Sequence, residues 1–519
     1  MKTLITTLNS QYIHSNLAVR YLYSAAAGDG RNVHLREFTI NNEDSYIYGE
    51  ILKGDYDMVA FSCYIWNVEK TIYLAENLKK AAPHMQILLG GPEVSHDALD
   101  LLMENRFVDY IIQGEGEQSL RKLLDVLETE DGSGEGLGTD EVHQKKGAEL
   151  AGVDGLIYRF DGKVFINQAA EPAKMDMLSF PYRYIAPEND KILYYESSRG
   201  CPFNCAYCLS SLERRVRSLS MDRIFEDLRY FLLKEVKQVK FIDRTFNFDR
   251  KRALEIFKYL IENDNGVTNF HMEICADLID NDTLQLLRTA RKGLFQFEIG
   301  VQSTNREALF AVNRSADVVP VLDNICNVVA LGNIEVHADL IAGLPFEDYD
   351  SFAHSFNNVY MTKAHKIHLG FLKLLKGTAI RKSAEKYGYA YRSKPPYEVI
   401  SNSFISAKDL VRLHQVEHVL DLYYNRGGFE KTLYYFTTEV AASPFAFYEE
   451  LADYYYLKGY QHASHKKEDL YRILDAFAVY KDRRAKGCGP YIHGLLEEDL
   501  RANMNPEAVK KFEKKGWEI

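Results

Sequence analysis

Three of the chain's seven cysteines lie within one short segment. Cys201, Cys205 and Cys208 stand in "SSRGCPFNCAYC", residues 197–208. On a cubane iron–sulfur cluster, three protein thiolates leave one iron without a protein ligand. Such an open iron can bind a chelating cofactor or substrate, as an open zinc position does. The spacing therefore predicts a cluster with one free coordination position.

A zinc site is the main alternative for these cysteines. Structural zinc normally has a fourth Cys or His nearby in the sequence. After Cys208, no Cys or His occurs until His271. The pattern therefore favours an iron–sulfur cluster, with Phe203 and Tyr207 supplying apolar surface around it.

A repeated strand-and-helix pattern surrounds the cysteine segment and predicts how it is positioned. Parallel βα units of this kind form a barrel or partial barrel, with functional residues at the carboxyl ends of the strands. The cysteines follow the first strand, so we expect them at that mouth. The six expected strands are residues 191–197, 238–246, 269–278, 295–302, 334–343 and 366–375.

The first third of the chain also alternates apolar runs with helical patterns. This alternation predicts a parallel sheet covered by helices on both faces. Ligands bind beyond the carboxyl ends of such strands, where the chain has the turns "GGP" at 90–92 and "GEGE" at 114–117. The expected strands are residues 2–8, 33–40, 58–64, 86–91 and 108–114.

Bulk properties narrow the class of protein. A chain of 519 residues exceeds what one hydrophobic core usually supports, so we expect two or three domains. The net charge of -11 argues against nucleic acid or an anionic membrane as the main partner. The N-terminus lacks a signal-peptide pattern, and no run approaches the ~20 apolar residues of a membrane span. We therefore expect a cytoplasmic protein with reduced cysteines.

The glycine turns, the cysteine segment and the βα series together resemble cobalamin-dependent radical S-adenosylmethionine (SAM) enzymes over roughly residues 1–380. The turns resemble those of the family's N-terminal cobalamin-binding domain. The Asp-x-His-x-x-Gly motif of free-standing corrinoid carriers is absent from this domain. This departure implies cobalt bound without that histidine; His14, His84 and His96 are more simply explained as solvated or hydrogen-bonded loop residues.

The resemblance implies an α/β protein with four parts. Residues 1–150 form a Rossmann-like cobalamin-binding domain with a linker, and residues 151–190 form a hairpin connector around "DG". Residues 191–390 form a radical SAM core, a partial (β/α)6 TIM barrel. Residues 391–519 form a helical C-terminal domain, expected over the barrel mouth. The segment 128–150 has no apolar periodicity and is expected to be a surface loop or linker.

The resemblance also implies cofactor contacts. The three cysteines hold a [4Fe-4S] cluster whose fourth iron is chelated by SAM. At the second strand the family's usual Gly-Gly-Glu is absent, and every SAM position could instead be a barrel-core polar residue or salt bridge. The expected SAM contacts are Asp243, Arg244 and Thr245 for the methionine part, Glu273 and Gln302 for the ribose, Arg314 for the carboxylate and Asp339 near the adenine. The expected cobalamin contacts are Ser62, Trp66, Asn67, Gly90, Gly91, Pro92, Glu93, Gly114, Glu115, Gly116 and Glu117.

Three functions remain open. The first is methyl transfer from SAM through cobalamin to a carbon radical on a small-molecule or peptide substrate. The second is a radical cyclisation or rearrangement without methyl transfer, and the third is a corrinoid sensor or carrier with an inactive barrel. Either radical function needs an external electron donor of the flavodoxin or ferredoxin type. tRNA methylthiolation normally needs a second cysteine triad in the first domain, where only Cys63 occurs.

The tail after residue 391 has helical periodicity and many tyrosines. The tyrosines fit either a substrate pocket or ordinary helix packing. Near the end, "AKGCGPYIHG" contains Cys488 and His493. A loose loop thiol is the simpler explanation of Cys488, and a substrate or corrinoid contact is the alternative.

Overall fold

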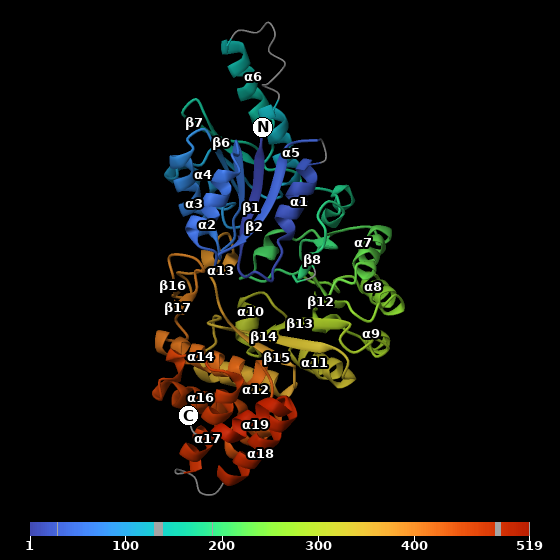
Figure 1. Ribbon diagram of the computed structural model, residues 1–519, viewed down its shortest axis with the longest axis vertical. Helices are drawn as coiled ribbons and strands as arrows, with labels where there is room; N and C mark the ends of the chain where they lie inside the picture. Colours follow the sequence, from blue (N-terminus) through green and yellow to red (C-terminus); the bar gives the residue numbers. More distant parts are fainter. Residues whose placement is uncertain (28–29, 129–138, 189, 483–488, 518–519) are drawn as a thin grey trace.

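The computed structural model describes residues 1–519 except 28–29, 129–138, 189, 483–488 and 518–519. Figure 1 shows a first sheet with its helices at one end, a second sheet in the middle and a helical region at the other end. No helix among the described residues is both long and apolar enough to cross a membrane.

The first sheet has seven strands in the order β2-β1-β3-β4-β5-β6-β7, of which the first five are parallel. One core lies between the sheet and helices α1 (Leu17–Ala26) and α5 (Glu117–Glu128). A second core fills the other face, beneath α2 (Asp44–Lys53), α3 (Val68–Ala81) and α4 (Ala98–Glu104). The expected sheet with helices on both faces is confirmed. Its parallel strands are β1 (Thr3–Asn9), β2 (Val33–Thr39), β3 (Met58–Ser62), β4 (Gln86–Gly90) and β5 (Tyr110–Ile112).

The expected hairpin consists of β6 (Leu156–Phe160) and β7 (Lys163–Ile166). Its turn residues Asp161 and Gly162 have φ angles of 51° and 71°, and positive values at both positions are typical of a tight hairpin turn. The hairpin also extends the first sheet, because β6 pairs antiparallel with β5.

Part of the expected linker was predicted wrongly. Residues Thr139–Ala151 form helix α6, whereas residues 129–138 lie outside the described part of the chain. The segment "QKKGAELA" is rich in residues of high helix propensity, which stabilise a helix even without an apolar stripe. The absence of apolar periodicity was therefore a poor guide here.

The second sheet has the order β15-β14-β13-β12-β11-β8, and every neighbouring pair is parallel. It is the predicted partial barrel, with β8 and β15 at its two edges. Apolar residues face the surrounding helices, and the alternate positions are polar. The strands are β8 (Leu193–Tyr195), β11 (Gln238–Phe241), β12 (Asn269–Glu273), β13 (Phe295–Gln302), β14 (Glu335–Ala342) and β15 (Lys366–Phe371). The covering helices are α7 (Met221–Leu233), α8 (Arg250–Glu262), α9 (Asn281–Leu287), α11 (Val319–Leu331) and α12 (Tyr349–Met361).

From Ala407 onward the C-terminal region is helical, as predicted, but these helices do not cover the barrel mouth. Helices α14 and α16 pack on each other, α16 packs on α12, and α14 contacts β15, at the end of the molecule opposite the first sheet (Figure 1). Tyr423, Tyr448 and Tyr471 are fully buried in its core, which favours helix packing as the reason for the many tyrosines. The helices are α14 (Ala407–Leu420), α15 (Glu430–Tyr435), α16 (Pro444–Leu457), α17 (Lys467–Asp482), α18 (Gly489–Asn503) and α19 (Pro506–Lys515).

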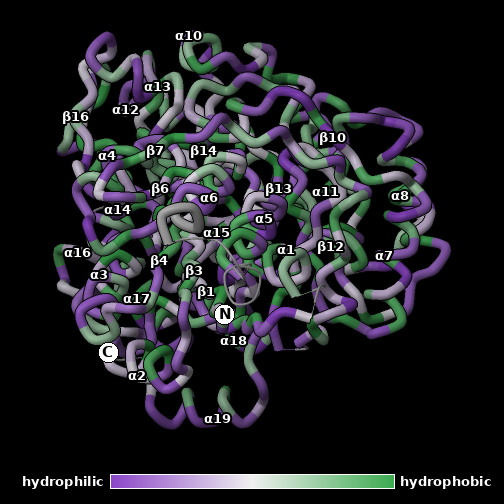
Figure 2. Tube along the Cα trace, turned by 90° about the horizontal axis from the view of Figure 1, so that it is seen from above, coloured by the Kyte–Doolittle hydropathy of each residue, from purple (hydrophilic) through white to green (hydrophobic). Residues whose placement is uncertain are grey.

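Hydrophobic and hydrophilic residues alternate along these helices and strands. Figure 2 shows hydrophobic and hydrophilic stretches alternating along most of the chain trace. This alternation is expected of elements that bury one face in a core and leave the other in water.

Candidate functional site

The cysteine segment forms a tightly folded loop after β8. Gly200 has a φ angle of 90°, and a Cβ there would lie 2.5 Å from the carbonyl oxygen of Arg215. Only glycine fits both constraints. The amide of Cys201 then donates to the carbonyl of Glu213 over 3.1 Å, so the first cysteine is fixed against the segment that follows the loop.

All three thiols are free and lie near one another. Burial raises the pKa of Cys205, Arg314 lowers it, and the neighbouring sulfurs of Cys208 and Cys201 raise it further. The Sγ atom of Cys201 lies 3.6 Å from the Oγ1 atom of Thr245. Three thiols in one partly buried loop can together bind a metal cluster as thiolates, and this fits an iron–sulfur cluster.

Arg314 connects the cysteine loop to the end of β13. Its guanidinium donates to the hydroxyl of Tyr207 over 3.1 Å and to the carbonyl of Gly300 over 2.7 Å, and it lies 3.9 Å from the Sγ atom of Cys205. A planar fork so placed can also bind a carboxylate.

Gln302 follows at a β-bulge with an unusual φ angle of 72°. A Cβ at position 300 would lie 2.1 Å from the Nε2 atom of Gln302, so glycine there leaves room for this side-chain position. The buried Oε1 atom of Gln302 has no hydrogen-bond partner among the described residues. An unpaired buried acceptor is costly, so this atom is available to a ligand hydroxyl or amine.

The other expected SAM residues have different surroundings. Burial raises the pKa of Glu273 to about 7, although Arg244 and Lys240 lower it. Asp243 is fully buried and accepts bonds from the Ser197 amide at 2.7 Å and the Ser197 hydroxyl at 2.6 Å. It also accepts from Ser198 and Arg252. Asp243 therefore fixes the start of the cysteine loop.

A polar network across the barrel strands joins Asp339, a predicted SAM contact, to residues that sequence reasoning missed. The Glu298 carboxylate lies 2.8 Å from the Nζ atom of Lys240 and 3.0 Å from the Nε2 atom of His271. Asp339 lies 3.0 Å from the Nδ1 atom of His368. Ligand atoms of Glu298, Asp339 and His368 all lie within 4.8 Å of one another. Glu298 already has a cationic partner in Lys240, and Asp339 has a hydrogen-bond partner in His368. The sequence signal for this network was the polar residue at every second strand position.

The carboxyl-end loops of the first sheet form a shaped surface. Gly91 has a φ angle of 104°, and a Cβ there would lie 2.6 Å from the carbonyl oxygen of Cys63. Asn67 is buried and donates to the carbonyls of Leu8 and Ser62. The Trp66 ring stacks on Tyr64 at 4.5 Å and stays 43% exposed. The surface therefore offers a flat aromatic pair beside a glycine turn.

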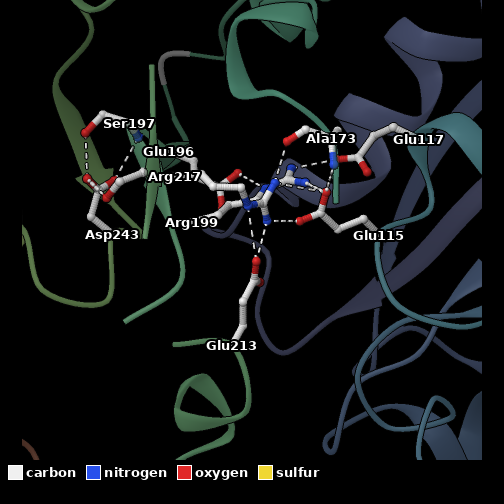
Figure 3. Close-up of polar contacts among 10 residues, drawn as sticks. Glu115, Glu117, Ala173, Glu196, Ser197, Arg199, Glu213, Arg217 and Asp243 are labelled. Atoms are coloured by element: carbon white, nitrogen blue, oxygen red, sulfur yellow. Dashed lines mark hydrogen bonds and ion pairs between the residues drawn. The ribbon is translucent and has the colours of Figure 1, made fainter. Parts of the chain in front are cut away.

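Two arginines bind this surface to the barrel (Figure 3). Arg199 directly precedes the loop glycine and lies 2.6 Å from Glu117, 2.8 Å from Glu196 and 3.2 Å from Glu115. Arg217 binds Glu115, the carbonyl of Ala173 and, over 2.6 Å, Glu213. We call these six side chains, Arg199, Arg217, Glu115, Glu117, Glu196 and Glu213, the arginine clamp. Glu115 and Glu117, expected as cobalamin contacts, thus have guanidinium partners.

Further contacts join the loops of the first sheet to the barrel and the segments that follow it. Glu93, another expected cobalamin contact, accepts a hydrogen bond from Tyr397 and lies 3.2 Å from the Nζ atom of Lys376. His14 contacts the Tyr194 hydroxyl through its Nδ1 atom at 2.8 Å. Loops that follow β1, β4 and β5 therefore all touch the barrel, and the cysteine loop lies at this junction.

The remaining candidates lie apart from this junction or outside the described residues. His84 is exposed, and His493 pairs with Asp475 within the helical region at 2.8 Å. Cys488 lies outside the described part of the chain.

Comparison with known families agrees with this arrangement. Residues 3–124 match the B12 binding domain, residues 195–359 match the radical SAM superfamily, and residues 385–518 match a protein family of unknown function, DUF4080. The chain joins a B12 binding domain to a radical SAM domain.

Curated relatives match over part of their length. An uncharacterised methyltransferase of Pyrococcus horikoshii is 30% identical over 217 residues, which cover 40% of this chain and 43% of that protein. The 2-(S-pantetheinyl)-carbapenam-3-carboxylate methyltransferase of Streptantibioticus cattleyicolor is 25% identical over 361 residues, 66% of this chain and 50% of that protein. The chain thus spans about half the length of these relatives.

Solved structures share the fold. The cobalamin-dependent SAM radical enzyme OxsB, solved with aqua-cobalamin and SAM, matches with a TM-score of 0.62 at 15% identity over 99% of this chain and 83% of its own. The radical SAM methyltransferase TsrM from Kitasatospora setae matches with a TM-score of 0.61 at 14% identity over 81% of this chain and 90% of its own. At such identities the likeness shows the architecture alone.

We predict that Arg199→Ala destabilises the protein by about 3–5 kcal/mol, because the buried carboxylates of Glu117 and Glu196 lose this cation, while Glu115 keeps Arg217. Urea unfolding measures the loss, and hydrogen exchange over residues 110–120 should rise as the first sheet loosens from the barrel. Arg183→Ala removes an ion pair whose arginine is 54% exposed, and should cost at most about 1 kcal/mol. Equal losses in the two variants would contradict a structural role for the clamp.

Glu196 predicts a pH dependence. Burial raises its pKa to about 7, while Arg199 lowers it. A carboxyl with a raised folded-state pKa favours folding at low pH, and this contribution is lost as pH rises from about 5 to 8. Glu196→Gln should therefore gain stability relative to the native protein over this range. Denaturant unfolding at each pH measures the free energy of unfolding. Glu226→Gln, at an exposed site, is the control. If the free energy of unfolding depends on pH in the same way for Glu196→Gln and the native protein, the prediction is refuted.

Proposed function

We propose that the chain reductively cleaves SAM at a [4Fe-4S] cluster and uses cobalamin to methylate an unactivated carbon of a small-molecule substrate. One observation carries the proposal: Arg199, two residues before the first cluster cysteine, is held by Glu115 and Glu117 of the B12 binding domain. The cysteine loop therefore lies next to the loops of the B12 binding domain. A reaction that uses two cofactors needs their binding sites to be close together.

The residues fit the cluster and SAM. Cys201, Cys205 and Cys208 hold three irons and leave the fourth for the amino and carboxylate groups of SAM. Arg314 binds the SAM carboxylate with the fork that already spans Tyr207 and Gly300. The free Oε1 atom of Gln302 accepts a ribose hydroxyl. Glu273, on the adjacent strand, accepts the second hydroxyl when ionised.

The residues also fit cobalamin. Gly90 and Gly91 let the corrin approach the backbone, and the Trp66 and Tyr64 rings supply a flat apolar contact. Glu93, Glu115 and Glu117 act by holding the domain against the barrel. When bound, the cluster supplies the electron that breaks the SAM sulfonium, and the corrinoid supplies a methyl carrier between SAM and the substrate carbon.

Relatives support both methyl transfer and one alternative. The relatives described above include methyltransferases, and a hopanoid C-3 methylase of Methylococcus capsulatus is 26% identical over 288 residues. An anaerobic magnesium-protoporphyrin IX monomethyl ester cyclase of Rubrivivax gelatinosus is 26% identical over 268 residues. A radical cyclisation without methyl transfer is therefore the second candidate. Both reactions need an external reductant.

Incubation of the reduced, reconstituted protein with methyl-labelled SAM tests the proposal. We expect label on cobalamin, together with 5′-deoxyadenosine once substrate is supplied. Deoxyadenosine without any transferred label would select the cyclisation candidate. The triple variant C201A/C205A/C208A should lose bound iron and deoxyadenosine formation, whereas Cys326→Ala, which changes an exposed free cysteine, should retain both.

A further inference from the structure

A small exposed surface borders the cysteine loop. Phe203 is 39% exposed and Leu212 is 48% exposed, although both are large and apolar. We call this patch the loop surface. It consists of Pro202, Phe203, Asn204, Leu212, Arg214 and Arg215, all of which are exposed.

The loop surface is the outer side of the cluster site. The backbone of residues 213–215 packs directly on Gly200 and Cys201. Arg214 donates to the Oδ1 atom of Asn204 over 2.8 Å, so its guanidinium is fixed above the loop between the first two cysteines. A protein bound here would lie against the loop that carries the three cysteines.

Charge on the loop surface is opposite in sign to that of the chain. The chain carries a net charge of -11, yet Arg214 and Arg215 form no ion pair within the described part of the protein. The nearest carboxylate in sequence, Glu213, lies 2.6 Å from Arg217 and is not paired with Arg214 or Arg215. Exposed apolar side chains beside unpaired guanidinium groups are typical of a protein-binding surface, and arginine is enriched in such interfaces.

We propose that the loop surface docks an acidic electron-carrier protein of the flavodoxin or ferredoxin type. The inference rests on the proposed function, which needs one electron per SAM cleaved. The reduced carrier loses one electron to the cluster. That electron reduces the sulfonium, the S–C5′ bond breaks, and methionine and a 5′-deoxyadenosyl radical form. Positive charge steers an acidic carrier to this face, and Phe203 and Leu212 give it apolar contact.

The double variant R214E/R215E tests the surface. The rate of 5′-deoxyadenosine formation is measured with reduced flavodoxin at low salt, and separately with dithionite, which needs no docking surface. We expect the flavodoxin-driven rate to fall at least tenfold and the dithionite-driven rate to stay unchanged. Arg501→Glu, which changes a 58%-exposed arginine in the distant helical region, should leave both rates unchanged. For the native protein, added salt should slow only the flavodoxin-driven reaction.

A binding measurement gives a readout apart from turnover. Calorimetry with oxidised flavodoxin should show weaker binding to R214E/R215E and to Phe203→Ser than to the native protein or Arg501→Glu. A flavodoxin-driven rate and affinity equal to those of the native protein would overturn the docking site while leaving the proposed function intact. Failure of the native protein to cleave SAM with dithionite would overturn the proposed function, and the docking proposal with it.

Discussion

The buried guanidinium of Arg199 is the interaction on which the relation between the two sheets depends. Its side chain is 13% exposed and lies among carboxylates that come from both the first sheet and the barrel. Removing these charges from water is costly, and the cost is recovered only when all partners are in place. A displaced first domain would leave Glu115 and Glu117 without their arginine partners, and Arg199 would keep only Glu196.

Glycines shape the loops on both sides of the junction between the first sheet and the barrel. Gly200 permits the cysteine loop to fold against residues 213–215, and the bulge at Gly300 turns Gln302 with a free acceptor toward the same region. On the opposite face, Gly91 brings a turn against Cys63. At each of these glycines a Cβ would collide with neighbouring atoms.

The sequence predicted elements and local chemistry well. Periodicity identified the strands of both sheets, since a strand that is buried on both faces or alternates in polarity leaves a local pattern. The cysteine spacing likewise predicted which residues would hold a cluster, and the structure brings those three thiols together in one loop. The helix Thr139–Ala151 was missed because its stability comes from propensity, while the prediction relied on apolar periodicity.

Contacts between distant residues could not be predicted in this way. Arg199 and Glu117 are 82 positions apart, and Tyr397 and Glu93 are 304 apart. No local pattern encodes such pairs, because they depend on how two separately folded units meet. The family resemblance consequently assigned Glu93, Glu115 and Glu117 to cobalamin, while their side chains also serve to hold the two units together.

The central claim is that three thiolates at this junction hold a cluster with one iron open to SAM. Mössbauer spectroscopy of protein reconstituted with 57Fe, recorded with and without SAM, tests it most directly. The account predicts four irons per chain, of which one changes its isomer shift and quadrupole splitting when SAM binds. Four irons with spectra unaffected by saturating SAM, or no cluster after reconstitution, would contradict it.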